Sequence, residues 1–146
     1  MGRDQKIKPR KLVHITLSQR LMSELTRLGG YEGKTAARMA AYLLECILPI
    51  AQTEKTYRLV PLEFDLGSPC CSLQPAMTPE EKDFLYLYAK EGGLSNSEQA
   101  CQLLWLAVRF YDQYQRPGLL LRKEEFVSRV RRDIVVQREE LLQPKS

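Results

Sequence analysis

The sequence predicts a mainly α protein that begins with one short β-strand and then repeats a helical hairpin. Residues 12–17, "LVHITL", alternate with the two-residue period of a half-buried strand. Most of the next roughly ninety residues show the three- and four-residue spacing of amphipathic helices instead. A shift of sixty residues superimposes the caps and apolar positions of the first hairpin on a second one at about residues 70–115.

The first predicted helix covers about residues 18–29. Ser18 suits the N-cap position, because its hydroxyl can accept a hydrogen bond from the amides of the first turn. Apolar side chains then recur at helical spacing at Leu21, Leu25 and Leu28. The helix is expected to end at "GGYEG", where glycine permits the positive φ of a helix end.

The second predicted helix starts after Thr35, a suitable cap, and is expected to stop at Pro49, which discourages continuation of a helix. Its apolar stripe consists of Met39, Leu43, Leu44, Ile47 and Leu48. A strand, a helix, a turn and a helix therefore occupy residues 1–51, the first predicted domain. Residues 52–77 follow as a connector, in which "YRLVPLEF" (57–64) fits a short edge strand.

The second hairpin opens residues 78–146, with Thr78 as cap, Pro79 at the first helical position and Glu81 at the capping-box position. Chance coincidence is the alternative to a true repeat, because helical hairpins share these signals generally. Pro75 falls where the first copy has its strand, so the second copy is predicted to have lost its ribbon strand. Whether the two copies pack together within one chain as a pseudo-dimer is open at this point.

A long amphipathic helix is predicted at the C-terminus, where Phe126, Val130 and Ile134 recur every four residues among many charges. Packing of this helix on its own domain is the favoured interpretation. Binding of a protein partner by the C-terminal region is the other one.

Charge is distributed unevenly along the chain, whose net charge is +4. Residues 1–38 carry nine Lys and Arg against three Asp and Glu, whereas residues 39–115 carry five against ten. The basic surface therefore belongs to the strand and its surroundings. The sequence has neither a signal-peptide pattern nor a long apolar run, so we expect a cytoplasmic protein without membrane contact.

The sequence offers no catalytic, metal-binding or cofactor-binding pattern, so an enzyme is not expected. The four cysteines, Cys46, Cys70, Cys71 and Cys101, lack zinc-ligand spacing and are interpreted as reduced thiols. "GKT" at residues 33–35 is not a nucleotide-binding P-loop, because that motif requires glycine where this chain has Leu28. The chain has a single histidine, His14, and no serine or cysteine in a nucleophile-elbow setting.

The strand "VHITLS", the capped leucine helix and the second helix "GKTAARMAAYLLECI" resemble the ribbon-helix-helix family of DNA-binding proteins over about residues 10–50. The resemblance implies that two copies of the strand, one from each subunit of a homodimer, pair antiparallel and enter the major groove of DNA. Val13, Ile15 and Leu17 would form the dimer core.

In this interpretation the outward side chains of the ribbon contact base edges. The expected base contacts are Lys11, Leu12, His14 and Thr16. For His14 the alternative is a solvent-facing histidine with no role. The second helix would hold the DNA backbone by its first-turn amides, and the expected phosphate contacts are Arg10, Lys34, Thr35 and Arg38. "GKT" has the alternative of being only a polar helix start.

The sequence thus predicts a sequence-specific DNA-binding protein that acts as a transcriptional repressor. In the second copy Glu98 replaces Arg38 and would repel phosphate, so this copy is not expected to contact DNA. The alternative function is a protein-interaction adaptor or an antitoxin-like protein, in which the C-terminal helical region carries the main activity.

Overall fold

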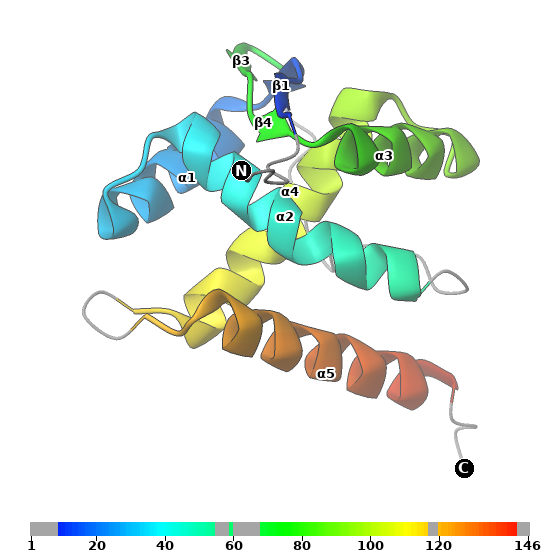
Figure 1. Ribbon diagram of the computed structural model, residues 1–146. Helices are drawn as coiled ribbons and strands as arrows, with labels where there is room; N and C mark the ends of the chain where they lie inside the picture. Colours follow the sequence, from blue (N-terminus) through cyan, green and yellow to red (C-terminus); the bar gives the residue numbers. More distant parts are fainter. Residues whose placement is uncertain (1–8, 55–58, 60–67, 117–119, 143–146) are drawn as a thin grey trace, which may run out of the picture.

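The computed structural model describes residues 9–54, 59, 68–116 and 120–142, and it contains two copies of a strand–helix–helix unit followed by one further helix (Figure 1). The first copy consists of β1 (Lys11–Leu12), β2 (Ile15–Leu17), α1 (Gln19–Glu32) and α2 (Ala36–Thr53). The second consists of β3 (Cys71–Leu73), β4 (Ala76–Met77), α3 (Pro79–Glu91) and α4 (Asn96–Tyr114), and α5 (Lys123–Leu142) ends the described chain. The predicted mainly α class is confirmed.

The helix caps confirm the sixty-residue repeat. The hydroxyls of Ser18 and Thr78 accept hydrogen bonds from backbone amides in the first turns of α1 and α3. Thr35 and Ser95 do the same for α2 and α4. The turns inside both hairpins contain a left-handed glycine, Gly33 with φ 67° and Gly93 with φ 71°. Glycine adopts this conformation without the steric cost that a Cβ atom brings.

The two copies join through an antiparallel two-stranded ribbon. β2 pairs with β3, so that Ile15 lies opposite Leu73, and β1 pairs with β4, so that Leu12 lies opposite Ala76. The register is the same in both ladders and places residue 14 opposite residue 74, its own equivalent in the repeat. The ribbon therefore has a pseudo-twofold axis at this position.

This pairing corrects three expectations. The strand was predicted to pair with another subunit, but its partner belongs to the same chain. The second copy has kept its strand, so residues 52–77 are more than a connector, and the described chain has more than one strand. Pro75 cannot donate to the ladder, yet its carbonyl accepts from the amide of Val13 at 3.0 Å. One missing donor interrupts the ladder without abolishing it. Apart from Leu59, the predicted edge strand "YRLVPLEF" lies outside the described residues.

One hydrophobic core is built from both copies. The inward side chains of the first strand, Val13, Ile15 and Leu17, are 3%, 1% and 1% exposed and pack in this core. These residues were predicted to form the core of a two-chain dimer, but in the structure the second copy of the same chain covers them. α2 and α4 cross in the middle of the molecule, and the ribbon lies at one end (Figure 1).

Two helices extend beyond their predicted ends. α1 continues through Gly29 to Glu32, and α2 continues through Pro49 to Thr53. Both extensions are held by tertiary packing, since Gly29 is buried and Ile50 is fully buried after the proline. Local propensity for a helix end is a weak preference that such burial outweighs.

Gly29 is required by a close approach of two backbone segments. A Cβ atom on Gly29 would lie 2.4 Å from the backbone oxygen of Lys34, whereas a Cβ on Gly30 would meet nothing within 4 Å. We expect Gly29→Ala to lower the free energy of unfolding by about 1–3 kcal/mol through this overlap. Gly30→Ala should raise it by about 0.5–1 kcal/mol, because alanine favours the helix. Urea unfolding of both variants tests this, and equal effects would contradict it.

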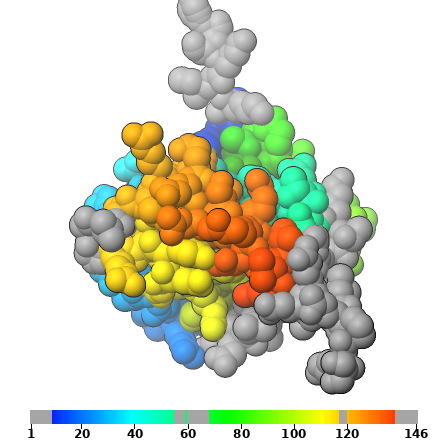
Figure 2. Space-filling model, turned by 90° about the horizontal axis from the view of Figure 1, so that it is seen from below, coloured from blue at the N-terminus to red at the C-terminus, as the bar shows by residue number. Residues whose placement is uncertain are grey.

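α5 packs across the end of the molecule opposite the ribbon (Figures 1 and 2). Its predicted apolar stripe, Phe126, Val130 and Ile134, is buried against the shared core. The ring of Phe126 makes an edge contact with Tyr111 of α4, with 5.9 Å between the centroids. The predicted terminal amphipathic helix is thus confirmed, with its stripe turned toward its own chain. Within the described residues, no helix combines the length and apolarity that a membrane crossing needs.

Candidate nucleic-acid interface

The outward face of the ribbon is formed by six side chains, three from each copy. On the first strand Leu12 is 66% exposed, His14 is exposed and Thr16 is half-buried. The opposing residues of the second copy are Ala76, half-buried, and Gln74 and Ser72, both exposed. Lys11, at the start of β1, is exposed as well. The four predicted base-contact residues therefore lie at or beside one surface.

Sequence reasoning missed the three residues of the second strand, Ser72, Gln74 and Ala76. The signal was present, since the sixty-residue shift places them on Leu12, His14 and Thr16. Pro75 does not exclude a strand here, because a two-stranded ribbon tolerates one absent donor. Gln74 is the most informative of the three, since a glutamine amide can donate to and accept from the same base edge.

A groove of about 480 Å³ lies between the ribbon and the start of α2. We call it the basic groove, because its lining includes three cationic side chains, Arg10, Lys34 and Arg38, and one carboxylate, Glu45. Leu12, Gln74 and Ala76 line it on the ribbon side. The hydroxyl of Thr35 accepts from the Arg38 amide at 3.2 Å, which fixes the first turn of α2. No acidic residue lies in that turn, so its positive dipole end and the exposed Arg38 side chain attract anions.

Lys34 is held in place rather than free in solvent. Its Nζ lies 2.9 Å from Oε1 of Glu32 and 4.2 Å from the centre of the Tyr42 ring. Burial raises the pKa of the Tyr42 hydroxyl, which stays neutral beside the ammonium group. The Glu32 carboxylate offsets part of the Lys34 charge, so Arg38 supplies the larger share of the positive field in this groove.

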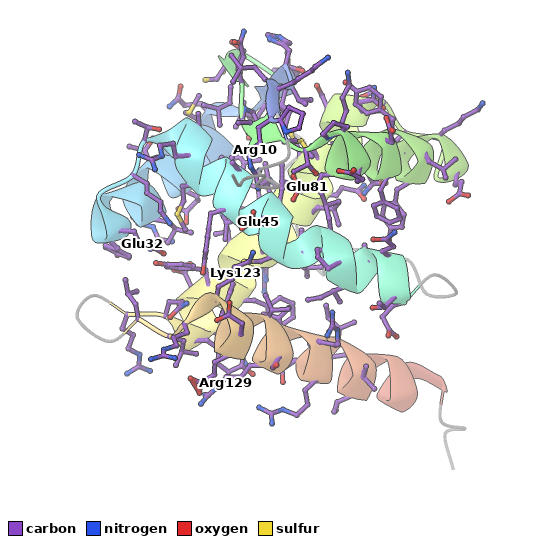
Figure 3. All side chains as sticks on the ribbon, in the orientation of Figure 1. Arg10, Glu32, Glu45, Glu81, Lys123 and Arg129 are labelled. Carbon is purple, nitrogen blue, oxygen red and sulfur yellow. The ribbon has the colours of Figure 1, made fainter. Side chains whose placement is uncertain are left out.

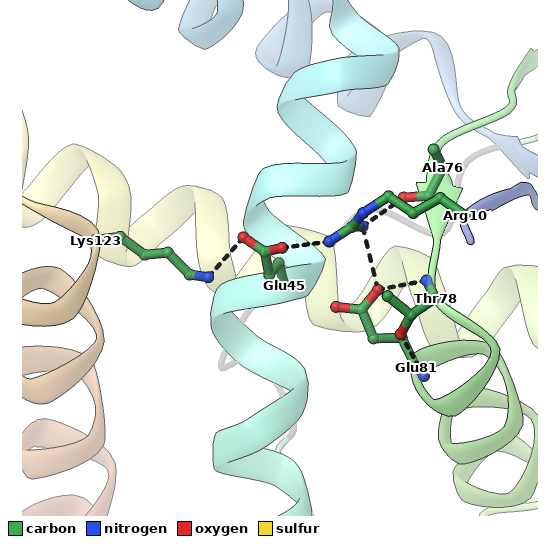
Figure 4. A network of polar contacts seen from close by, with 6 residues as sticks. All are labelled: Arg10, Glu45, Ala76, Thr78, Glu81 and Lys123. Atoms are coloured by element: carbon green, nitrogen blue, oxygen red, sulfur yellow. Dashed lines mark hydrogen bonds and ion pairs between the residues drawn. The ribbon is translucent and has the colours of Figure 1, made fainter. Parts of the chain in front are cut away.

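Arg10 takes part in an ion-pair network that joins several elements (Figures 3 and 4). Its guanidinium lies 2.6 Å from Glu45 of α2 and 3.5 Å from Glu81 of α3, and donates to the Ala76 carbonyl at 3.3 Å. Lys123 of α5 contacts the second oxygen of Glu45 at 2.6 Å. Arg10 thus connects the two copies, and phosphate would have to compete with two carboxylates for it. Its predicted phosphate contact stays a prediction.

This network makes the fold sensitive to acid. Burial raises the pKa of the Glu45 carboxyl, but the pairs with Lys123 and Arg10 outweigh burial and hold that pKa below its ordinary value of 4.5. A depressed folded-state pKa stabilises the fold above the unfolded-state pKa, and the gain is lost as the pH falls through the folded value.

We therefore expect Glu45→Gln to lower the free energy of unfolding by about 1 kcal/mol at pH 7, and by progressively less as the pH falls through the folded-state pKa of Glu45. Denaturant unfolding at pH 7 and at a series of acidic pH values measures the difference. The matched control is Glu125→Gln, which removes the exposed pair of Glu125 with Arg129 within α5 and should change little at any of these pH values. A pH-independent loss for Glu45→Gln would contradict the ion-pair explanation.

The second copy has an equivalent groove of opposite charge. This acidic groove, of about 570 Å³, lies between the ribbon and the start of α4, and its lining includes Thr16, Leu21, Ser97, Glu98, Cys101 and Trp105. Glu98 occupies the position equivalent to Arg38 and accepts from the Ser95 amide at 2.9 Å in a capping box. The Thr16 amide donates to the Ser97 hydroxyl at 3.0 Å. Glu98 makes this groove less favourable for phosphate than the basic groove, even with the Arg20 guanidinium 5.7 Å from the centre of the Trp105 ring.

The cysteines of the hairpins have structural positions. Burial raises the pKa of the Cys46 thiol to about 12 and that of the Cys101 thiol to about 11. Both thiols are therefore protonated and unreactive near neutral pH. Cys101 lies beside the ribbon and donates from Sγ to the Thr16 carbonyl at 3.4 Å. Among the described residues, no group of three or more His, Cys, Asp and Glu side chains is placed to hold a metal ion.

Comparisons of the chain with protein-family models, with curated proteins and with solved structures find no match.

Proposed function

We propose that this chain binds double-stranded DNA by inserting its two-stranded ribbon into the major groove, in the manner of ribbon-helix-helix proteins. The observation that carries the proposal is an antiparallel ribbon, interrupted at Pro75, whose inner face packs against the core and whose outer face carries His14, Gln74 and four further side chains. A two-stranded ribbon matches the width of the major groove. The exposed imidazole and amide supply the hydrogen-bonding groups that base edges require.

The basic groove supports the same proposal. Lys34 and Arg38, together with the first-turn amides of α2, lie beside one end of the ribbon, where a ribbon in the major groove meets the phosphate backbone. Such contacts fix the position of a protein on the duplex but carry no sequence information. α5 lies at the opposite end of the molecule and leaves the ribbon face open (Figure 1).

We propose transcriptional repression as the biological consequence, since a chain in the major groove of a promoter excludes other proteins from that site. The homodimer expected from the sequence is no longer needed to build a ribbon, because one chain supplies both strands. An association of chains on DNA would use other surfaces. The adaptor alternative gains no support from α5, whose apolar stripe packs on its own chain.

The proposal is tested by selecting binding sites from a randomised duplex library with the purified chain. Fluorescence anisotropy then measures the affinity for a selected and a scrambled duplex at two salt concentrations. We expect the selected duplex to bind at least about 100-fold more tightly, and both affinities to fall as salt rises. No enrichment, or equal affinities, would contradict sequence-specific binding. Co-purification of a stoichiometric protein partner in the absence of DNA affinity would favour the adaptor.

A further inference from the structure

The two halves of the ribbon differ in chemistry, and this difference bears on the DNA sequence that the chain binds. We propose that one chain recognises an asymmetric DNA sequence, and that the basic groove sets the orientation of the chain on that sequence. This inference rests on the proposed function. A ribbon made by two identical subunits presents identical residues on both sides of its twofold axis and favours a palindromic site. This ribbon has the same geometry with unlike side chains.

The outward residues differ at all three equivalent positions. Leu12 corresponds to Ser72, His14 to Gln74, and Thr16 to Ala76. Because the strands are antiparallel, Leu12 lies across from Ala76 at one end, and Thr16 lies across from Ser72 at the other. The ribbon face therefore runs from an apolar end, through an amide and an imidazole on the pseudo-twofold axis, to a hydroxyl end.

Each part of this face matches different base-edge chemistry in the major groove. Leu12 and Ala76 present methyl groups, which favour the C5-methyl group of thymine. Gln74 can bind adenine in a bidentate manner, donating to N7 and accepting from N6. Thr16 and Ser72 donate or accept and are tolerant of the base that they meet. The predicted site therefore contains thymine at one end and adenine near its centre.

The grooves on the two sides of the ribbon give this order a direction. The basic groove is lined by Leu12 and Ala76 and adjoins the apolar end, whereas the acidic groove is lined by Thr16 and adjoins the hydroxyl end. Arg38 on one side and Glu98 on the other occupy equivalent positions. Strong phosphate contact is therefore expected on one flank only, next to the thymine end of the site.

Site selection with the full chain, followed by measurement of stoichiometry on the shortest selected duplex, tests the inference. We expect one chain per duplex and a core that differs from its own reverse complement. Phosphate ethylation should interfere with binding on the thymine flank and not on the other. A palindromic core, two chains on the shortest duplex, or equal interference on both flanks would overturn the inference while leaving DNA binding intact. Absence of all DNA affinity would overturn the proposed function as well.

Two exposed single variants test the assignment of the central positions. Gln74→Ala should lose roughly 5- to 150-fold in affinity for the selected site and lose its preference at one adenine, with an unchanged unfolding midpoint. His14→Ala is the matched variant on the other strand and should relax preference at a different base pair. The asymmetric assignment would be contradicted if both variants lost base preference at the same base pair, or if neither variant lost base preference at all.

Exchange of the two strand faces provides the decisive variant. It combines Leu12→Ser with Ser72→Leu, His14→Gln with Gln74→His, and Thr16→Ala with Ala76→Thr. The order of the selected bases should then reverse relative to the flank where ethylation interferes, because Lys34 and Arg38 have not moved. An unreversed order in a folded exchange variant would overturn the inference. If that variant does not fold, the single variants and the wild-type site decide the question.

Discussion

Replacement of Ile15 by aspartate is expected to unfold the chain. Ile15 is 1% exposed at the centre of the inner ribbon face, opposite Leu73. A carboxylate there would lose its hydration without gaining a partner, and such burial costs more than about 4 kcal/mol, which is a large part of the stability of a small domain. Circular dichroism during urea unfolding measures the loss, which should leave little helical signal even without denaturant.

His14→Asp is the matched control for this substitution. The neighbouring position is exposed on the outer face, so the same carboxylate should change the free energy of unfolding by about 0.5 kcal/mol or less.

Unfolding of the parent protein distinguishes a ribbon formed within one chain from a ribbon shared by two chains. With both strands in one chain, its midpoint should not depend on protein concentration, whereas a ribbon shared by two chains would shift the midpoint upward with concentration. A folded Ile15→Asp protein would contradict the burial of this face.

The helices could be predicted from sequence because their signals are local. Ser18, Thr35, Thr78 and Ser95 each cap a helix within three residues of their own position, and the apolar stripes follow the helical period. The ribbon could not be derived in the same way, since its two strands are separated by about fifty residues. Pro75 is unfavourable in a strand, because proline has no amide hydrogen to donate. Only the structure shows that its carbonyl joins the ribbon by accepting a hydrogen bond from the Val13 amide.

The candidate site, too, could be predicted from the sequence only in part. The alternation of residues 12–17 assigns Leu12 and His14 to the outer face correctly. Nothing in the sequence links Arg10 to Glu45 and Glu81, which approach it only after both copies have packed together. The sixty-residue shift aligns Glu98 with Arg38, so the sequence predicts a negative charge at the equivalent point of the second copy. That this charge lies in a groove beside the Thr16 end of the ribbon is known only from the structure.

Removal of both cationic side chains from the basic groove is expected to weaken DNA binding regardless of sequence. In the Lys34→Gln, Arg38→Gln double variant, two phosphate contacts are lost, and each contributes roughly 0.9 units to the slope of log affinity against log salt. We expect the slope to flatten by about two units and the affinity near 0.1 M salt to fall by about 10- to 100-fold. The ratio between selected and scrambled duplexes should stay close to that of the parent protein, because phosphate contacts position the protein without distinguishing bases.

Glu98→Gln makes the matched change in the acidic groove. The amide keeps an oxygen that can accept the hydrogen bond of the Ser95 amide, so α4 should retain its cap while the negative charge is removed. The affinity should be unchanged or slightly higher, since the long-range repulsion of phosphate is reduced. Anisotropy titrations of the two variants at two salt concentrations compare the grooves directly. An unchanged salt slope in the Lys34/Arg38 variant, or a loss of binding in folded Glu98→Gln protein, would place the backbone contact on the other side of the ribbon.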